Sequence, residues 1–266
     1  MRIYIHTDLE GVSGIDRAEM LDESTPDYQR ARELLMGDLN AAVDGAFAGG
    51  ATEVTVLDSH GGGGRNFLPD RLDPRARNDA KPNGKWWGVL DGSFAGTFFV
   101  GAHAMAGTQN GFLDHTQSST HWHDYTVNGR RFGELAQWAM AAGHFGVPLL
   151  MVSGDEAACA EARRFFHPVE TAVVKSGAGR NRAEIVDLDD ARACIFESAR
   201  KAVSHVGVAK PFAPILPAEI VLRFNRSDYC DDAAGLPGVE RLDARTIRWV
   251  AASALDLFYW DLGGRA

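Results

Sequence analysis

The sequence predicts an α/β fold, with three layers around a parallel-rich sheet and a smaller α+β lobe at the C-terminal end. Short, nearly continuous apolar runs alternate with amphipathic segments, which is typical of a parallel sheet covered by helices on both faces. The chain of 266 residues is also long enough for one large domain with a smaller lobe. We expect the α/β domain over residues 1–212 and the lobe over 213–266, with part of 61–96 able to join the lobe.

The first half of the α/β domain contains three expected strands and one long helix. "RIYI" (2–5) predicts the first strand. The stretch over 28–50 follows, stops at Gly49-Gly50, and has apolar residues at helical spacing, namely Leu35, Leu39, Ala42, Val43, Ala46 and Phe47. "EVTVL" (53–57) and, after a Gly/Pro-rich excursion, "TFFV" (97–100) predict two further strands.

The second half repeats the alternation. "GELAQWAMAAGHFG" predicts a helix that begins near Glu134. The remaining elements of this domain are a strand–turn–helix unit, a strand and a helix, at 147–158, 171–175 and 189–207. From Pro214 onward, "PILPAEIVLRF" and "ARTIRWVA" indicate a strand, a short helix, a strand and a helix, which would form the smaller lobe.

Composition and charge exclude several function classes. The 36 acidic and 27 basic residues give a formal charge of −9, which supports neither nucleic-acid nor anionic-membrane binding. No apolar run approaches the length of a membrane span, and "MRIYIHTD" lacks the features of a signal peptide. Cys159, Cys194 and Cys230 form no C-x-x-C and cannot all pair. We therefore expect a reduced, cytoplasmic protein that binds no nucleic acid and no membrane.

The apolar runs of the expected sheet end in acidic or imidazole side chains. Asp8 and Glu10 follow the first run, Asp58 and His60 the second, and His103 the third. In parallel sheets, ligands bind outside the carboxyl ends of the strands. Asp8 and Glu10 point to the same side of an extended chain, about 7 Å apart at the backbone. Two buried carboxylates this close repel each other unless a cation compensates them.

Taken singly, these residues have ordinary structural explanations. Asp155, at the end of the strand in 147–158, suits the N-cap of the next helix. Asp58 suits a turn or a position behind a ligand, and a lone His60 or His103 is more often hydrogen-bonded in a core or loop. Taken together, ligand-type residues at the same kind of position in three separate units indicate a metal site.

The ligand types favour zinc. Carboxylates and neutral imidazoles are its usual oxygen and nitrogen ligands, and two of each exceed the three protein ligands of a mononuclear catalytic site. The surplus of carboxylate favours two metals bridged by an acid, for which Asp8 is the candidate.

Two other motifs are weaker signals. His121 and His123 of "HWH" lie on one face of an extended segment, but a lone H-x-H is little evidence for a metal pair. "SGAGRN" (176–181) is similar to a phosphate-cradling turn but lacks the Lys-Ser/Thr ending. The sequence contains neither a G-x-S-x-G elbow nor a Walker-type loop.

Together these motifs resemble the D-aminopeptidase family, historically labelled dipeptide transport proteins. "HTDLEG" (6–11) matches the family signature S-x-D-x-E-G except at its first position. The resemblance continues through "VLDSHGG", "GAHAMAG", "FLDHTQ", "NGRRFGELA", "VPLLMVSGDEAA", "AVVKSGAGRNRA" and "LPGVERLDARTIRWVA". It therefore covers nearly the whole chain.

The resemblance implies a peptidase that binds two zinc ions per chain and forms a homo-oligomer, a ring-shaped decamer. The metal ligands that it implies are Asp8, Glu10, His60, His103 and Glu134. It also implies that His115 is catalytic and lies outside the metal set. His6 replaces the family serine, on the same face as Asp8. It is either a donor to a ligating carboxylate or an added ligand.

The expected function is therefore the hydrolysis of short peptides or amides, and the resemblance alone implies an N-terminal D-amino acid. We prefer His115 as a general acid/base over a nucleophile, because the metals already supply an activated water. Two alternatives stay open: a cytoplasmic dipeptide-binding protein without catalysis, and a two-metal phosphoesterase. The phosphoesterase would need basic residues around the metals, for which Arg65 and Arg180 are weak candidates.

Overall fold

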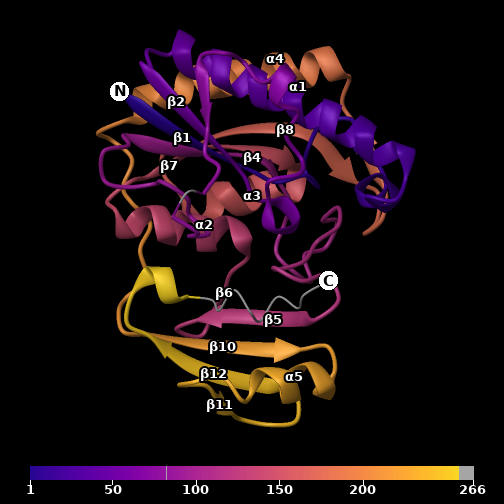
Figure 1. Cartoon of the computed structure of the whole chain (residues 1–266), viewed down its shortest axis with the longest axis vertical. Helices are drawn as coiled ribbons and strands as arrows, with labels where there is room; N and C mark the ends of the chain where they lie inside the picture. Colours follow the sequence, from indigo (N-terminus) through magenta and orange to yellow (C-terminus); the bar gives the residue numbers. More distant parts are fainter. Residues whose placement is uncertain (82, 258–266) are drawn as a thin grey trace.

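The computed structural model describes residues 1–81 and 83–257, built around a seven-stranded sheet (Figure 1). The strand order is β3-β2-β1-β4-β7-β8-β9. These strands are β1 (Arg2–Thr7), β2 (Glu53–Asp58), β3 (Ala76–Asn78), β4 (Gly96–Ala102), β7 (Leu149–Asp155), β8 (Glu170–Gly177) and β9 (Ala183–Ile185). All neighbours are parallel except β9, which runs antiparallel to β8. The prediction of a parallel-rich α/β sheet is confirmed.

Helices cover both faces of this sheet (Figure 1). One face carries α1 (Pro26–Ala48) and α4 (Leu188–Ala202), and the other carries α2 (Glu134–His144) and α3 (Glu156–Phe165). Successive side chains of a strand point to opposite faces, so β1 serves two cores. Ile3 and Ile5 pack in the cluster that contains α1 and α4, whereas Tyr4 packs in the cluster that contains α2.

The helix ends follow local sequence signals. α1 begins with Pro26 in its first turn and ends before Gly49, two residues earlier at each end than the predicted 28–50. The Asp155 carboxylate accepts a hydrogen bond from Ala158 N (2.7 Å), so its predicted role as the N-cap of α3 is confirmed. α4 spans 188–202 and continues as a 3-10 turn over Val203–His205, close to the predicted 189–207.

A second sheet of five strands lies on the far side of α2, in the order β11-β12-β10-β5-β6 (Figure 1). Its strands are β5 (Trp122–Val127), β6 (Arg130–Arg131), β10 (Ala218–Phe224), β11 (Glu240–Arg241) and β12 (Thr246–Ala251), and α5 (Ser227–Ala233) packs against β10 and β12. In the described part of 61–96 no strand joins this sheet. The segment 122–131 joins this sheet instead. Its strand β5 pairs with β10, where buried side chains such as Tyr125 and Leu222 meet across the strands, and β6 pairs with β5.

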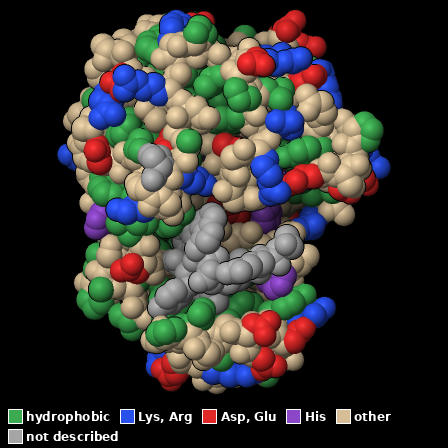
Figure 2. Space-filling model, viewed as in Figure 1, with side chains coloured by type: hydrophobic (Ala, Val, Ile, Leu, Met, Phe, Trp, Pro, Cys, Tyr) green, Lys and Arg blue, Asp and Glu red, His purple; other side chains and the backbone are tan. Residues whose placement is uncertain are grey.

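The tail after β12 forms one 3-10 turn, Ala254–Asp256. The rest of the helix predicted at the end of the chain lies outside the described residues. Within residues 1–81 and 83–257, no helix is both long and apolar enough to cross a membrane. Acidic and basic side chains are mixed over the face seen in Figure 2, and histidines lie at the waist between the two sheets. The division of the chain at 212/213 stays a prediction.

Candidate metal centre

Three neighbouring strands place four of the five predicted ligands at one edge of the large sheet. β1 lies between β2 and β4, all three are parallel, and their carboxyl ends therefore meet. Asp8 and Glu10 follow β1, His60 follows β2, and His103 follows β4 directly. The strand order turns back at β1, so this edge is the topological switch point where α/β sheets bind ligands.

The first part of the centre joins His60 to the acid pair. His60 Nδ1 lies 3.1 Å from Asp8 Oδ1 and 3.0 Å from Glu10 Oε2. Asp8 and Glu10 are buried. Burial alone would raise the pKa of Glu10, but the surrounding imidazoles, His60 first, hold that pKa well below its usual range.

The second part joins His103 to Asp8 and Glu134. His103 Nε2 lies 3.3 Å from Asp8 Oδ2 and 3.4 Å from Glu134 Oε1. Glu134 is the first residue of α2, where the helix dipole favours a carboxylate. Burial opposes its ionisation, but the imidazole of His103 outweighs burial and lowers the pKa of Glu134 to about 2.

His115 reaches the same place from a loop. Its ring stacks on the His103 ring, with centroids 4.0 Å apart and planes 8° from parallel. Nδ1 donates to Leu113 O (2.7 Å), so the proton lies on Nδ1, and Nε2 faces Glu134 Oε1 (3.5 Å) and Glu10 Oε1 (3.9 Å). His103 is held in the same way, because its Nδ1 donates to Ala104 O (3.0 Å). In its neutral form, the form that binds a metal, a ring held by a carbonyl at one nitrogen presents a lone pair at the other.

The donor set fits a metal. Among the described residues, Asp8 Oδ2 and His103 Nε2 are buried and, although they lie 3.3 Å apart, neither makes a hydrogen bond of acceptable geometry. Buried polar atoms are rarely left unsatisfied, and here both belong to groups that bind zinc. Two sets of side chains place their ligand atoms within 4.8 Å of one another: Asp8, Glu10 and His103, and His103, His115 and Glu134.

The other predicted positions lie around the centre. Asp58 accepts hydrogen bonds from Asn66 N (2.9 Å) and Asn66 Nδ2 (2.7 Å), and Asn66 Nδ2 also donates to His60 O (2.9 Å). Asp58 therefore organises the turn that carries His60. His6 packs on Trp138 and bonds to Ser59 Oγ (3.2 Å) rather than to a carboxylate. Burial lowers the pKa of His6 to about 3.

The His121–His123 motif does not reach the centre. His121 Nδ1 bonds to the hydroxyls of Ser118 and Thr120, both at 2.8 Å, and His123 Nδ1 lies 3.2 Å from Asn225 Oδ1. In the described part of the chain, the candidate metal sets include neither residue.

One residue behind the centre was missed by sequence reasoning. Lys175 is buried at the end of β8, and its Nζ donates to Glu10 O (2.8 Å) and to Ile15 O (2.7 Å). Burial lowers the pKa of Lys175 to about 7. Its ammonium holds the backbone that carries the acid pair. A lysine closing the apolar run "TAVVK" is the signal that could have identified it.

An acid pair, a further carboxylate and three imidazoles at the carboxyl edge of a parallel sheet define a metal-dependent hydrolase of the α/β class. Comparison with known proteins identifies the family. The sequence profile of the M55 peptidases, described as D-aminopeptidase, matches residues 1–261, so the chain belongs to the D-aminopeptidase family and is a hydrolase.

Two relatives agree with this assignment. A D-aminopeptidase of Bacillus subtilis (strain 168) is 31% identical over 262 residues, which is 97% of this chain and 94% of the relative. A solved structure, described as the zinc-dependent D-aminopeptidase DppA from Bacillus subtilis, a self-compartmentalizing protease, superposes with a TM-score of 0.90 at 30% identity. That alignment covers 97% of this chain and 94% of the other. The family resemblance predicted from the motifs is confirmed.

Proposed function

We propose that this protein removes the N-terminal residue, a D-amino acid, from short peptides or amides. The observation that carries the proposal is a pair of buried ligand atoms that make no hydrogen bond, Asp8 Oδ2 and His103 Nε2, within a cluster of acids and imidazoles. The name of the Bacillus relatives, D-aminopeptidase, supports the substrate class.

The arrangement of the carboxylates favours two zinc ions per chain. One oxygen of Asp8 faces His60 and the other faces His103. In the same way, Oε2 of Glu10 faces His60 and Oε1 faces His115. We therefore assign Asp8, Glu10, His60, His103 and Glu134 as the ligands, with Asp8 shared between the two positions. When bound, zinc polarises a carbonyl and lowers the pKa of water.

His115 is assigned the proton transfer. Its Nδ1–H is held by Leu113 O, so Nε2 is the atom that can take a proton and return it. Nε2 faces Glu10 and Glu134, at the centre where the scissile bond must lie. A proton delivered from Nε2 to the nitrogen of that bond would release the amine.

The three carboxylates of the centre are buried at Asp8 and Glu10 and half-buried at Glu134, and all three are assigned as zinc ligands. Two zinc ions would more than neutralise their charge, so the charge of the loaded centre does not select an ammonium group. The free amino terminus of the substrate is proposed from the name of the relatives, D-aminopeptidase. An acetylated peptide lacks that terminus, so we expect it to be a poor substrate.

Assembly and location are part of the same proposal. We infer a homo-oligomer, and a decamer as the resemblance implies, because the relative of known structure is described as self-compartmentalizing. The three cysteines are free thiols, two of them buried, which favours the reducing cytoplasm.

The test is metal analysis combined with an assay on matched substrates. Metal-free protein is reloaded with zinc and given D-Ala-D-Ala, L-Ala-L-Ala, N-acetyl-D-Ala-D-Ala and a phosphate monoester. Hydrolysis of the free D-peptide that depends on zinc supports the proposal. Binding of the dipeptide without turnover would favour a binding protein, and turnover of the ester alone would favour a phosphoesterase.

A further inference from the structure

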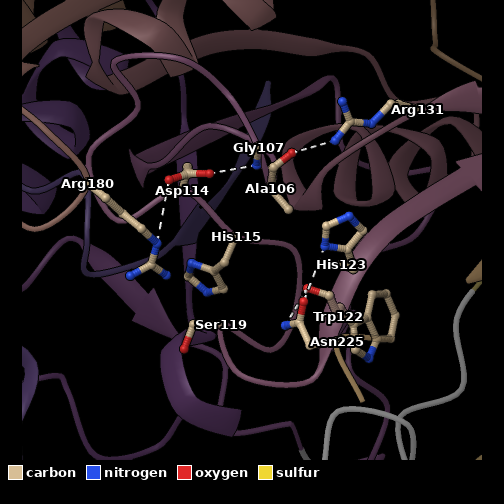
Figure 3. A pocket seen from close by; sticks show the side chains of 10 residues that line it. All are labelled: Ala106, Gly107, Asp114, His115, Ser119, Trp122, His123, Arg131, Arg180 and Asn225. Carbon is tan, nitrogen blue, oxygen red and sulfur yellow. Dashed lines mark hydrogen bonds and ion pairs between the residues drawn. The ribbon is translucent and has the colours of Figure 1, made fainter. Parts of the chain in front are cut away.

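A cavity of about 250 Å³ opens beside the metal centre, and His115 forms part of its wall (Figure 3). Arg180 and Arg131 enter it from opposite sides, and Asp114 lies between them. Each guanidinium already faces a carboxylate, Arg180 that of Asp114 (3.6 Å) and Arg131 that of Asp124 (2.5 Å), so the two arginines bring no excess positive charge. A guanidinium can still bind an anion there if it has N–H groups that make no other hydrogen bond.

The two arginines differ in how many of their guanidinium nitrogens already make hydrogen bonds within the protein. Arg131 donates from Nε to Asp124 Oδ1 (2.5 Å) and from Nη2 to Ala106 O (2.7 Å). Arg180 has its Nε 3.6 Å from Asp114 Oδ1 and donates from Nη1 to its neighbour Asn181 (3.1 Å). In the described part of the chain, Arg180 Nη2 makes no hydrogen bond. Arg180 is thus the better-placed arginine to receive an anion.

The Arg180 side chain stands on a rigid base. Arg180 O accepts a hydrogen bond from Leu113 N (2.7 Å), and the same Leu113 holds the His115 ring through its carbonyl. Ala178 N donates to Arg182 O (2.9 Å) and closes the turn. A Cβ on Gly177 would lie 2.2 Å from Asn110 O, so only glycine permits this approach. The turn "SGAGRN", which is similar to a phosphate cradle, therefore holds the backbone of Arg180 beside the loop that carries His115.

The direction of the substrate follows from the proposed function, on which this inference rests. The amino-terminal residue lies at the metal centre, because an aminopeptidase cleaves the bond next to it, and His115 protonates the leaving amine. The part of the peptide after the scissile bond must then lie on the His115 side, where the cavity is. The C-terminal carboxylate of the peptide lies about 3.5 Å further from the scissile bond for each residue after that bond. A cavity of about 250 Å³ suits one or two small residues.

We infer that Arg180 binds the C-terminal carboxylate of the substrate, so that the enzyme prefers short peptides with a free carboxyl end over the corresponding amides. A guanidinium recognises a carboxylate through charge and parallel N–H groups, and Nη2 is the nitrogen that is left for it. Arg180 is a specificity-determining residue in this reading, one or two residues away from the reacting bond.

The test compares D-Ala-D-Ala with its C-terminal amide, on the zinc-loaded protein and three variants. Wild type should have a kcat/KM for D-Ala-D-Ala about 10- to 100-fold above that for the amide. This factor corresponds to the free energy that a hydrogen bond between charged groups contributes to binding. Arg180→Gln should lose that factor on the acid, mainly through KM, and lose much less on the amide. Arg180→Lys should keep part of the preference, since lysine keeps the positive charge but lacks the two parallel N–H groups of a guanidinium.

The matched control is Arg182→Gln, which removes a positive charge from the same turn but not from the cavity wall. It should leave the acid-to-amide ratio as in wild type. Equal loss on both substrates in Arg180→Gln would overturn the inference and assign Arg180 to holding the loop. Equal cleavage of acid and amide by wild type would overturn it and leave the proposed function intact, whereas cleavage of neither would remove the proposed function and the inference with it.

Discussion

At the scale of single residues, the Asp8 carboxylate is divided between two histidines, with Oδ1 3.1 Å from His60 and Oδ2 3.3 Å from His103. In the proposed two-zinc centre, a ligand shared in this way would serve both metal positions. Asp8→Asn, which removes the charge at constant size, should therefore lower the zinc content at both positions. His103→Ala should empty mainly the position that it shares with Glu134. Elemental analysis after dialysis against a weak chelator measures this difference.

The matched control is Asp231→Asn, which changes an exposed carboxylate on α5 far from the centre. Its zinc content should equal that of wild type. If Asp8→Asn and His103→Ala lost the same amount of zinc, Asp8 would not be a bridge.

His115 offers a second test at this scale. Its Nε2 lies 3.5 Å from Glu134 Oε1, a position from which it can transfer a proton or bind a metal. As a general acid/base, His115→Ala should keep zinc near the wild-type level and lower kcat by roughly 10²–10⁴. His60→Ala should lose zinc and activity together, with partial recovery in excess zinc. Zinc analysis beside turnover separates the two roles, and a zinc-poor His115→Ala protein would make His115 a ligand.

At the scale of elements, α3 carries a buried acid that should make stability depend on pH. Glu161 Oε2 accepts a hydrogen bond from Met105 N (3.0 Å), and among the described residues Oε1 has no partner. Burial raises the pKa of Glu161 from 4.5 to about 7. Between these pH values the folded chain holds a proton that the unfolded chain releases, so stability falls as the pH rises, by about 3 kcal/mol at most.

Glu161→Gln keeps an acceptor for Met105 N and removes the charge. The variant should match wild type at pH 5 and be more stable at pH 8, by up to about 3 kcal/mol. Urea unfolding of the zinc-loaded proteins at both pH values measures the difference. Glu156→Gln, on the exposed first turn of the same helix, is the control and should show no such gain. A Glu161→Gln protein no more stable than wild type at pH 8 would show that this carboxylate is compensated.

The kind of element that carries each site residue also explains whether the sequence could predict that residue. Asp8 and His103 follow their strands directly, and His60 lies two residues after β2. Parallel strands share an edge, so local patterns were enough to bring these residues together. Glu134 and His115 come from a helix start and a loop, whose distance to that edge depends on long-range packing. Only the family resemblance identified them.

The same limit applies to the second sheet. Alternate burial in β5 shows that it has a buried face but not which strand lies beside it. Its partner β10 comes about 90 residues later in the chain, and no local signal joins them. The pairing therefore emerged only from the structure.

At the scale of the whole molecule, α2 joins the two sheets. It is buried nearly all round, from Leu135 to Ala142, as expected of a helix packed on both sides. A single core cluster runs from Tyr4 of β1 through Trp138 of α2 to Ile220 of β10. The helix that carries Glu134 is thus held from both sheets, and the metal centre depends on the smaller lobe even though no predicted ligand comes from it.

The fragment 1–212 should therefore not fold on its own, although its sequence contains every predicted metal ligand. Without β10, β5 loses its ladder partner and α2 exposes an apolar face to water. We expect the fragment to aggregate or to bind a hydrophobic dye, with less zinc and less helical circular dichroism than the full chain. Co-expression with 213–266 supplies β10 again and should restore a soluble, zinc-binding complex. A fragment that is soluble alone, with native circular dichroism and a full complement of zinc, would show instead that the chain divides into independent domains at 212/213.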